Sequence, residues 1–375
     1  MSIHISIHTG SGARFLNGTL GLVIDPTFLT KLHNQKVNVN VPKQREKSCK
    51  VDNAIDHVAF EVFKKIRNGV MNSREIIEHT AADGIRRTRT PRILCMVYTH
   101  SGAHSRIEAI ANTWGKECDG FFAASNATDL SIGAINLTHK GPEAYGNMWQ
   151  KVRSMWAYAY ENFLDDYDYF HICGDDAYVV VDNMKAYLQG KRISQLKEGY
   201  IDNISKVFYG EAKRWENLRE GQHRPLLLGV PLTVRNRLFP QGGGGYTLNR
   251  EALKLIGTKG GPLDTVLADF EDSREDVFIA SVLESIGTFV SDTRDDTGAF
   301  RYIPYKPSAV IQRNGKYPEK YGITSRTGMN KFSNETVALH LRGMDEKIAM
   351  DEVIYRTHDL VSGLCDTTRV DIKVL

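Results

Sequence analysis

The pattern that most constrains the fold is an alternation of short apolar runs and amphipathic segments that begins after Pro91. Four short apolar runs predict buried strands, at residues 92–98, 120–124, 134–137 and 167–173. Apolar residues recur at helical spacing over residues 107–114 and 148–163, and Gly115 is expected to close the first of these helices. Strands that alternate with helices through short links predict a mostly parallel sheet covered by helices on both faces.

The same alternation of apolar runs and amphipathic segments continues beyond residue 173. Further strands are predicted at residues 226–230, 241–247 and 288–291, and further helices at 249–256 and 275–286. No linker interrupts this pattern, so residues 91–358 are expected to form one domain, followed by a C-terminal tail at 359–375. Residues 1–90 hold scattered apolar patches and one predicted helix near 53–67, and we expect them to be an N-terminal extension or stem.

Composition excludes several classes of protein. Apolar residues make up 41% of the chain, enough to bury a core, and the net charge is only +3 with no long block of one sign, so no nucleic-acid partner is expected. No run approaches the roughly 18 apolar residues that cross a bilayer, and the N-terminus lacks a signal peptide. Five cysteines are compatible with a reducing compartment, whereas five Asn-X-Ser/Thr sequons point weakly to a secretory lumen.

The first candidate site is the sequence Gly174-Asp175-Asp176, which directly follows the strand predicted at 167–173. Ligands of open α/β sheets bind beyond the carboxyl ends of the strands, so these acids should lie at a cleft. Carboxylates are hard ligands that suit Mg²⁺ or Mn²⁺ together with a diphosphate. The alternative is a Gly-Asp turn whose carboxylates only cap backbone N–H groups.

Three other segments each admit a structural and a functional interpretation. Ser273 with Asp276 fits an N-terminal capping box, which the sequence favours, although Asp276 could instead be a general base. The run Gly242–Gly245 before Tyr246 allows either close approach to a ligand or a tight turn. A lone histidine in a strand-like run, such as His340, is more often a satisfied core residue than a metal ligand.

Taken in order, these segments resemble glycosyltransferase family 31, and its core-1 β1,3-galactosyltransferases most of all. The resemblance includes the helix around Lys151 and Tyr355 near the end. The matching segments are RILCMVYTHS (92–101), ANTWGKEC (111–118), YDYFHICGDDAYVVVDNM (167–184), GGGGYTLNREAL (242–253), REDVFIASVLESIG (274–287), SDTRDDTG (291–298) and ALHLRG (338–343).

The resemblance implies a GT-A fold, in which one Rossmann-like mixed sheet flanked by helices binds a UDP-sugar at the strand ends. It places Mn²⁺ or Mg²⁺ on Asp176 and His340, and it makes Asp276 the base of a single inverting displacement. Cys95 and Cys118 match a disulfide pair of the family. The residues expected to contact the UDP-sugar are Thr99, His100, Arg106, Lys151, Asp175, Gly244 and Tyr246.

The resemblance further implies transfer of galactose from UDP-galactose, in β1,3 linkage, to GalNAc-α-Ser/Thr of glycoproteins. The alternatives are another β1,3-hexosyl- or N-acetylhexosaminyltransferase, or a non-catalytic chaperone-like relative. Gly174, where the family has its first acid, keeps the last alternative open, whereas Asp176, Asp276 and His340 together favour an enzyme. The family's aromatic acceptor segment has no match between residues 307 and 334, so the acceptor is less defined than the donor.

The resemblance also carries expectations about the cellular setting of the chain. We expect a type II membrane protein of the Golgi or ER lumen that acts on a glycoprotein or glycan acceptor, with a homodimer as a possible state. The membrane anchor of the family is not present in this sequence. A truncated chain or an unrecognised start is therefore expected.

Overall fold

The computed structural model describes residues 57–82, 89–200, 202, 204–206, 215, 218–234, 237–312 and 326–356, all within one compact unit, residues 41–375. The helices are α2 (His57–Ala82), α3 (His104–Asn112), α4 (Met148–Phe163), α5 (Val181–Gln189), α6 (Lys191–Lys197), α8 (Arg250–Gly257), α9 (Pro262–Thr265), α10 (Glu275–Ser285), α11 (Pro307–Gln312) and α12 (Met344–Asp351). The strands are β1 (Ile93–Tyr98), β2 (Gly120–Ser125), β3 (Ala134–Asn136), β4 (Tyr169–Gly174), β5 (Ala177–Val179), β6 (Leu227–Val234), β7 (Arg237–Gln241), β8 (Tyr246–Asn249), β9 (Val290–Asp292), β10 (Tyr302–Ile303) and β11 (Ala338–His340).

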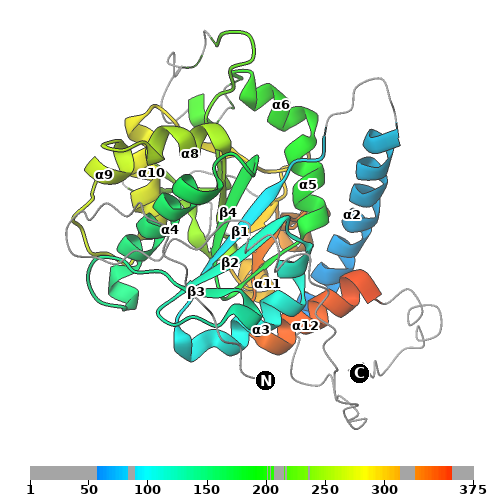
Figure 1. Ribbon diagram of the computed structural model, residues 1–375. Helices are drawn as coiled ribbons and strands as arrows, with labels where there is room; N and C mark the ends of the chain where they lie inside the picture. Colours follow the sequence, from blue (N-terminus) through cyan, green and yellow to red (C-terminus); the bar gives the residue numbers. More distant parts are fainter. Residues whose placement is uncertain are drawn as a thin grey trace, which may run out of the picture. The chain divides into compact units, whose positions relative to one another are not determined.

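The main sheet is mixed, with one parallel half and one antiparallel half (Figure 1). Its described strands follow the order β3-β2-β1-β4-β8-β6-β7, and β9 pairs with β6. Strands β3, β2, β1 and β4 are parallel to one another, as the βαβ pattern predicts. The pairs β4–β8, β8–β6 and β6–β7 are antiparallel, and β9 is parallel to β6. The mostly parallel sheet predicted from the alternation is therefore found only in the first half. The Rossmann-like mixed sheet flanked by helices, implied by the resemblance, is confirmed.

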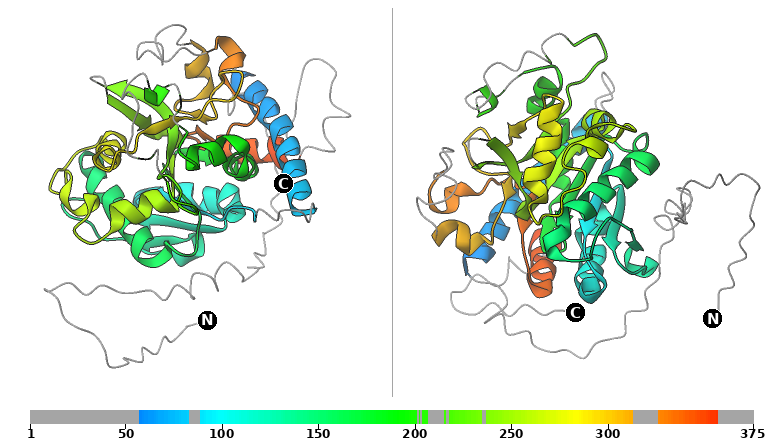
Figure 2. Two further views of the ribbon diagram at one scale, coloured as in Figure 1. Left: turned by 90° about the horizontal axis from the view of Figure 1, so that it is seen from above. Right: turned by 90° about the vertical axis from the view of Figure 1, so that its left-hand side faces the viewer.

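Helices cover the sheet in two groups. Helices α4, α8, α9 and α10 contact one another, and α2, α5 and α12 belong to a second group on the other side (Figure 1). The helix predicted near residues 53–67 is longer, because α2 extends to Ala82 and lies beside α5 (Figure 2). Its apolar residues Val62, Phe63 and Ile66 recur at helical spacing and are fully buried in the main core. This helix therefore packs onto the α/β core.

Helix α3 ends before the predicted stop at Gly115. The backbone of Thr113 leaves the helical region, and its hydroxyl donates to the carbonyl of Ala109 at 2.7 Å. Trp114–Glu117 then forms a separate 3₁₀ turn, η3, which leads to Cys118. Cys118 forms a disulfide with Cys95 of β1, with the two Cα atoms 6.2 Å apart, so the expected pair is confirmed.

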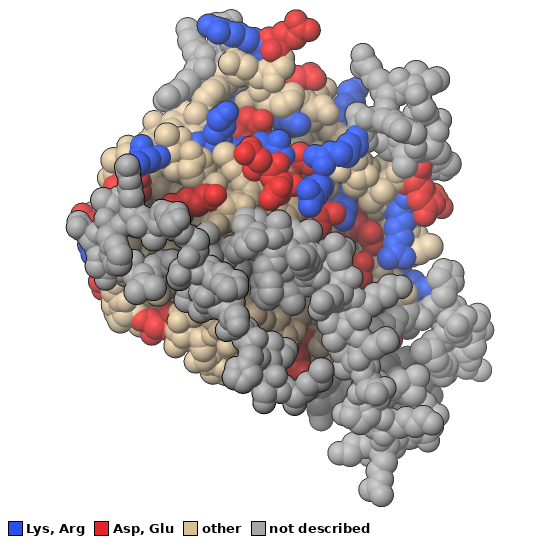
Figure 3. All heavy atoms as spheres, viewed as in Figure 1, with Lys and Arg blue, Asp and Glu red and all other residues tan. Residues whose placement is uncertain are grey.

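Acidic and basic side chains lie next to one another on the described surface (Figure 3). Pairs such as Arg74 with Asp182, at 3.0 Å, are solvent-exposed and contribute little to stability. None of the helices in the described ranges combines the length and the apolar character that a membrane span requires.

Candidate active site

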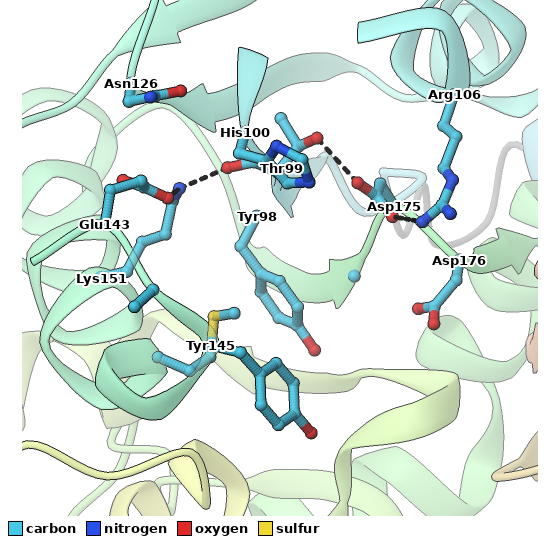
Figure 4. A pocket seen from close by; sticks show the side chains of 13 residues that line it. Tyr98, Thr99, His100, Arg106, Asn126, Glu143, Tyr145, Lys151, Asp175 and Asp176 are labelled. Atoms are coloured by element: carbon cyan, nitrogen blue, oxygen red, sulfur yellow. Dashed lines mark hydrogen bonds and ion pairs between the residues drawn. The ribbon is translucent and has the colours of Figure 1, made fainter. Parts of the chain in front are cut away.

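A cavity of about 510 Å³ opens at the carboxyl ends of β1 and β4 (Figure 4). The parallel register pairs Tyr98 with Gly174, so the residues that follow each strand emerge side by side. Six of the predicted site residues lie on its wall: Thr99, His100, Arg106, Lys151, Asp175 and Asp176. Its size is within the range of small-molecule sites, which is about 300–1,000 Å³. The strand-end cleft predicted from the sequence is thus present.

Asp175 is held in place by two donors from the neighbouring elements. The hydroxyl of Thr99, just after β1, donates to its Oδ2 at 2.8 Å. The guanidinium of Arg106, on α3, donates to its Oδ1 at 2.9 Å. Both carboxylate oxygens of Asp175 therefore have protein partners, and Figure 4 shows the three side chains in one line along the cavity wall.

Asp176 lies against His340 because a second, small sheet joins their strands. Strand β5 begins directly after Asp176 and pairs antiparallel with β11, which places His340 opposite Ala177. The Nε2 of His340 lies 2.9 Å from Asp176 Oδ2, and the amide of Leu341 donates to the Asp176 carbonyl at 2.7 Å. Burial alone would raise the pKa of Asp176, but the hydrogen bond and charge of His340, with Lys347 and Arg342, lower it.

Because Gly174 has no side chain, the carboxylate of Asp176 can lie directly beside it. A Cβ at this position would lie 2.6 Å from Asp176 Oδ1 and 3.0 Å from Cε2 of Tyr98. The carboxylate and the aromatic ring thus fill the place where a side chain would start. The absence of an acid at the first position of the motif is therefore matched by the packing around it.

Lys151 is a buried cation at the opposite wall of the cavity. Its ammonium donates to the carbonyl of Thr99 and to the carboxylate of Glu143, and only 3% of the residue is exposed. Burial would raise the pKa of Glu143, but hydrogen bonds from Lys151 and His139 lower it. Lys151 thereby ties α4 to the end of β1, and Figure 4 shows this link beside His100.

A second pair of adjacent acids, Glu275 and Asp276, begins α10. The predicted capping box of Ser273 with Asp276 is wrong, because the N-cap residue is Arg274 and its side chain makes no capping hydrogen bond within the described part of the chain. Asp276 instead accepts the amide of Gly242 at Oδ2 (3.0 Å) and that of Val277 at Oδ1 (2.8 Å). Burial raises the pKa of Asp276 despite these bonds.

Glu275 is the more deeply buried member of this pair, with 4% of the residue exposed. Burial and the charge of Asp276 raise its pKa well above the usual range, and the hydroxyl of Tyr246 donates to its Oε2 at 2.8 Å. Tyr246 is fully buried and is not part of the cavity wall. The predicted ligand contact Tyr246 thus lies beneath Glu275.

The glycine run before Tyr246 packs against protein. A Cβ on Gly242 would lie 2.8 Å from Glu275 Oε1, and one on Gly244 would lie 3.0 Å from the carbonyl of Ile303. Gly245 has a φ of +71°, which favours glycine. Of the two interpretations of this run, the structure supports the tight turn, and Gly244 lies outside the cavity wall.

Charges of both acid pairs act on Tyr98. It is the last residue of β1 and points into the cavity (Figure 4). Burial raises its pKa well above the usual range, and the charges of Glu275, Asp176 and Asp276 add to this effect. Sequence reasoning missed Tyr98 because it was treated only as the end of a buried strand, although an aromatic residue at that position could have marked it.

The wall also contains residues that no motif indicated. Asn126 follows β2, Glu143, Ala144 and Tyr145 lie in the segment that leads into α4, and Met148 is the first residue of that helix. Tyr145 is 76% exposed. Apart from Met148, these residues lie in connections, where no periodic pattern indicates which side chains face a ligand.

Asp176 and His340 are the donor set on which a divalent metal ion would depend. Carboxylate oxygen and imidazole nitrogen are both ligands that Mn²⁺ accepts. Among the residues that the structure describes, the buried Nδ1 of His340 has no hydrogen-bond partner. Within the described ranges no three His, Cys, Asp or Glu side chains lie close enough to hold a metal ion by themselves. The pair fits a metal site only if a ligand such as a diphosphate supplies further oxygens.

One known protein has a sequence similar to that of this chain. The chain is 25% identical over 219 residues to glycoprotein-N-acetylgalactosamine 3-beta-galactosyltransferase 1 of Xenopus laevis. The similarity covers 58% of this chain and 51% of that protein, so it spans about half the length of the curated relative. No family model matches the chain. The similarity indicates that this chain is related to galactosyltransferases, without identifying a specific member.

Proposed function

We propose that this chain is an inverting, metal-assisted β1,3-galactosyltransferase that uses UDP-galactose. The observation that carries the proposal is the contact of Asp176 with His340 beside the cavity at the strand ends. The similarity to the Xenopus galactosyltransferase supports it. The name of that relative supports galactose as the transferred sugar and N-acetylgalactosamine of a glycoprotein as the acceptor. We propose UDP-galactose as the donor and GalNAc-α-Ser/Thr as the acceptor.

The UDP half of the donor is proposed to lie along Thr99, His100 and Arg106. The guanidinium of Arg106 is partly exposed, so it can bind a phosphate oxygen while it keeps its bond to Asp175. Lys151 holds the end of β1 in position through the Thr99 carbonyl. Asp176 and His340 would hold a Mn²⁺ ion, which when bound offsets the charge that develops on the departing diphosphate.

Asp276 is proposed to take the proton of the acceptor hydroxyl. As the acceptor oxygen forms a bond to the anomeric carbon of galactose, the bond from that carbon to the UDP oxygen breaks and UDP leaves. The hydroxyl proton moves to the Asp276 carboxylate, whose position is fixed by the amides of Gly242 and Val277. Because burial raises its pKa, Asp276 is a stronger base than an exposed aspartate. One displacement converts the α-linked donor to a β-linked product.

We place this activity in the lumen of the Golgi or ER. The disulfide between Cys95 and Cys118 supports an oxidising compartment.

The experiment that tests the proposal measures UDP release by the purified chain with three donors: UDP-galactose, UDP-GlcNAc and UDP-GalNAc. Each donor is tested with Mn²⁺ or EDTA, and with a peptide that carries GalNAc-α-serine or the same peptide without the sugar. We expect release from UDP-galactose that depends on the sugar-bearing peptide and is lower in EDTA. The product linkage is then identified by NMR.

The outcomes separate the proposal from its alternatives. Acceptor-dependent release from UDP-GlcNAc or UDP-GalNAc alone would favour a different β1,3-transferase on the same scaffold. A folded chain that binds UDP but releases none with any donor would favour a non-catalytic relative. A chain that does not bind UDP even with Mn²⁺ would contradict the proposed function.

A further inference from the structure

Lys347 is a fully buried lysine close to the acid motif Asp175-Asp176. It lies on α12, which follows β11 and its His340, and its exposed fraction is 0%. Helix α12 is fixed at its start, since Glu346 accepts the amide of Gly343 at 2.9 Å and pairs with Lys306 at 3.0 Å. It packs against α3, the helix that carries Arg106. The side chain is therefore held inside the protein next to the candidate site.

The Lys347 ammonium has no hydrogen-bond partner in the part of the chain that the structure describes. It also forms no ion pair within 4.0 Å there, so it is not in direct contact with either aspartate. A buried water could satisfy its N–H groups, but it would not balance the charge. A buried charge is costly unless opposite charges lie nearby.

The charges that balance Lys347 come from the acid motif. The pKa of Lys347 is lowered to about 8, because burial and the charge of Arg106 outweigh the opposite effect of the Asp175 and Asp176 charges. At neutral pH Lys347 is therefore mainly a cation. In the low-dielectric interior its field at the motif is weakly screened.

The two carboxylates of the acid motif are therefore surrounded by three cationic side chains, so the positive charges outnumber the negative ones. Arg106 bonds Asp175 at 2.9 Å, and Arg342 Nε lies 3.9 Å from Asp176 Oδ2. Lys347 is the third cation whose charge acts on the motif. The affinity of a carboxylate site for a divalent cation depends on its negative charge. Each cation near the motif thus weakens a metal ion's binding and strengthens that of an anion.

We propose that Lys347 supplies a fixed positive charge to the acid motif, so that this chain binds a nucleoside diphosphate without a metal ion and binds the metal ion only weakly without the nucleotide. The inference rests on the proposed function for the identity of the nucleotide, UDP. Lys347 acts through Asp175 and Asp176 and is a positioning residue. Its charge has opposite effects on the two ligands.

The test measures three affinities of the full chain at pH 7 by calorimetry: UDP in EDTA, UDP in Mn²⁺, and Mn²⁺ without nucleotide. Lys347→Met keeps the length and apolar stem of the side chain and removes the charge. We expect the variant to bind UDP at least about tenfold more weakly, and Mn²⁺ at least about tenfold more tightly, than the wild type. The matched control is Lys331→Met, because Lys331 is 1% exposed and its ammonium donates to the Val310 carbonyl at 3.2 Å.

A loss of packing would weaken both ligands, so only opposite changes support the proposal. Unchanged affinities, or changes in one direction, would overturn it. The wild-type measurement is a test by itself if Lys347→Met does not fold. Wild type that binds UDP only with Mn²⁺ would overturn this inference alone, and wild type that binds UDP under neither condition would also contradict the proposed function.

Discussion

The two pairs of adjacent acids, Asp175-Asp176 and Glu275-Asp276, have opposite electrostatic surroundings. Asp176 lies near the cations Arg342 and Lys347 and against His340, which lower its pKa although burial would raise it. The pair on α10 accepts hydrogen bonds from amides and a tyrosine hydroxyl, and burial raises the pKa of both members. Asp176 is therefore held in its ionised form, whereas both acids of the pair on α10 are pushed towards the protonated form.

This difference assigns different chemistry to the two pairs. An ionised carboxylate with a histidine beside it suits a cation and a diphosphate, whereas a carboxylate with a raised pKa suits proton transfer. Tyr98 lies between the pairs, since the charges of both Asp176 and Asp276 act on its hydroxyl. Substitutions in each pair should therefore affect different steps of the proposed reaction.

The largest expected effect is that of Asp276→Asn. Asparagine keeps an oxygen for the Gly242 amide but cannot accept a proton, so transfer should fall by about 10²–10⁴-fold. UDP affinity should stay within about twofold, because Asp276 is not part of the cavity wall. Steady-state transfer and UDP calorimetry measure the two quantities.

Asp272→Asn is the matched control for this substitution. Asp272 belongs to the same segment, but its carboxylate pairs with the exposed Arg274 at 2.5 Å. Transfer near the wild-type rate in Asp276→Asn, with only a lower melting temperature, would limit Asp276 to a structural role at the end of α10. The two acid pairs would then no longer differ in function.

Much of the fold could be predicted from the sequence. The predicted helix at residues 148–163 coincides with α4, because its apolar residues keep one helical phase from Met148 to Phe163. The antiparallel half of the sheet could not be predicted. Its order β4-β8-β6 joins strands that are distant in the chain, and apolar runs do not specify their partners.

The candidate site was predictable where strand ends determine positions. Thr99 and Asp175 follow neighbouring parallel strands, so the cleft between them follows from topology. His340 required the resemblance, since its position depends on the pairing of β11 with β5. Lys347 carried no signal, because only burial of α12 against α3 distinguishes it from a surface lysine.

A smaller effect is expected from Gly174→Ala, which tests how tightly the first acid pair is held. The new Cβ would lie 2.6 Å from Asp176 Oδ1, so the carboxylate must shift away from its present position. UDP affinity in Mn²⁺ should fall by about tenfold, and stability by about 1–3 kcal/mol. Calorimetry and thermal unfolding measure these changes.

In the control Gly146→Ala a Cβ meets no atom within 4 Å, and both quantities should stay near wild type. Unchanged UDP affinity in Gly174→Ala would mean that Asp176 need not keep its present position.

The smallest effect, from Glu275→Gln, concerns the second pair and depends on pH. The folded-state pKa of Glu275 is raised above its unfolded value, so its contribution to stability is complete below about pH 4.3 and is lost as the pH rises through the folded pKa. Glutamine has no such loss, so the melting temperature of the variant relative to wild type should increase between pH 5 and pH 8, by at least about 2 °C. The exposed control Glu108→Gln should show a constant difference. If the melting-temperature difference between Glu275→Gln and wild type is also constant with pH, Glu275 ionises in the folded protein as it does in the unfolded chain. The electrostatic contrast between the two acid pairs would then rest on Asp276 alone.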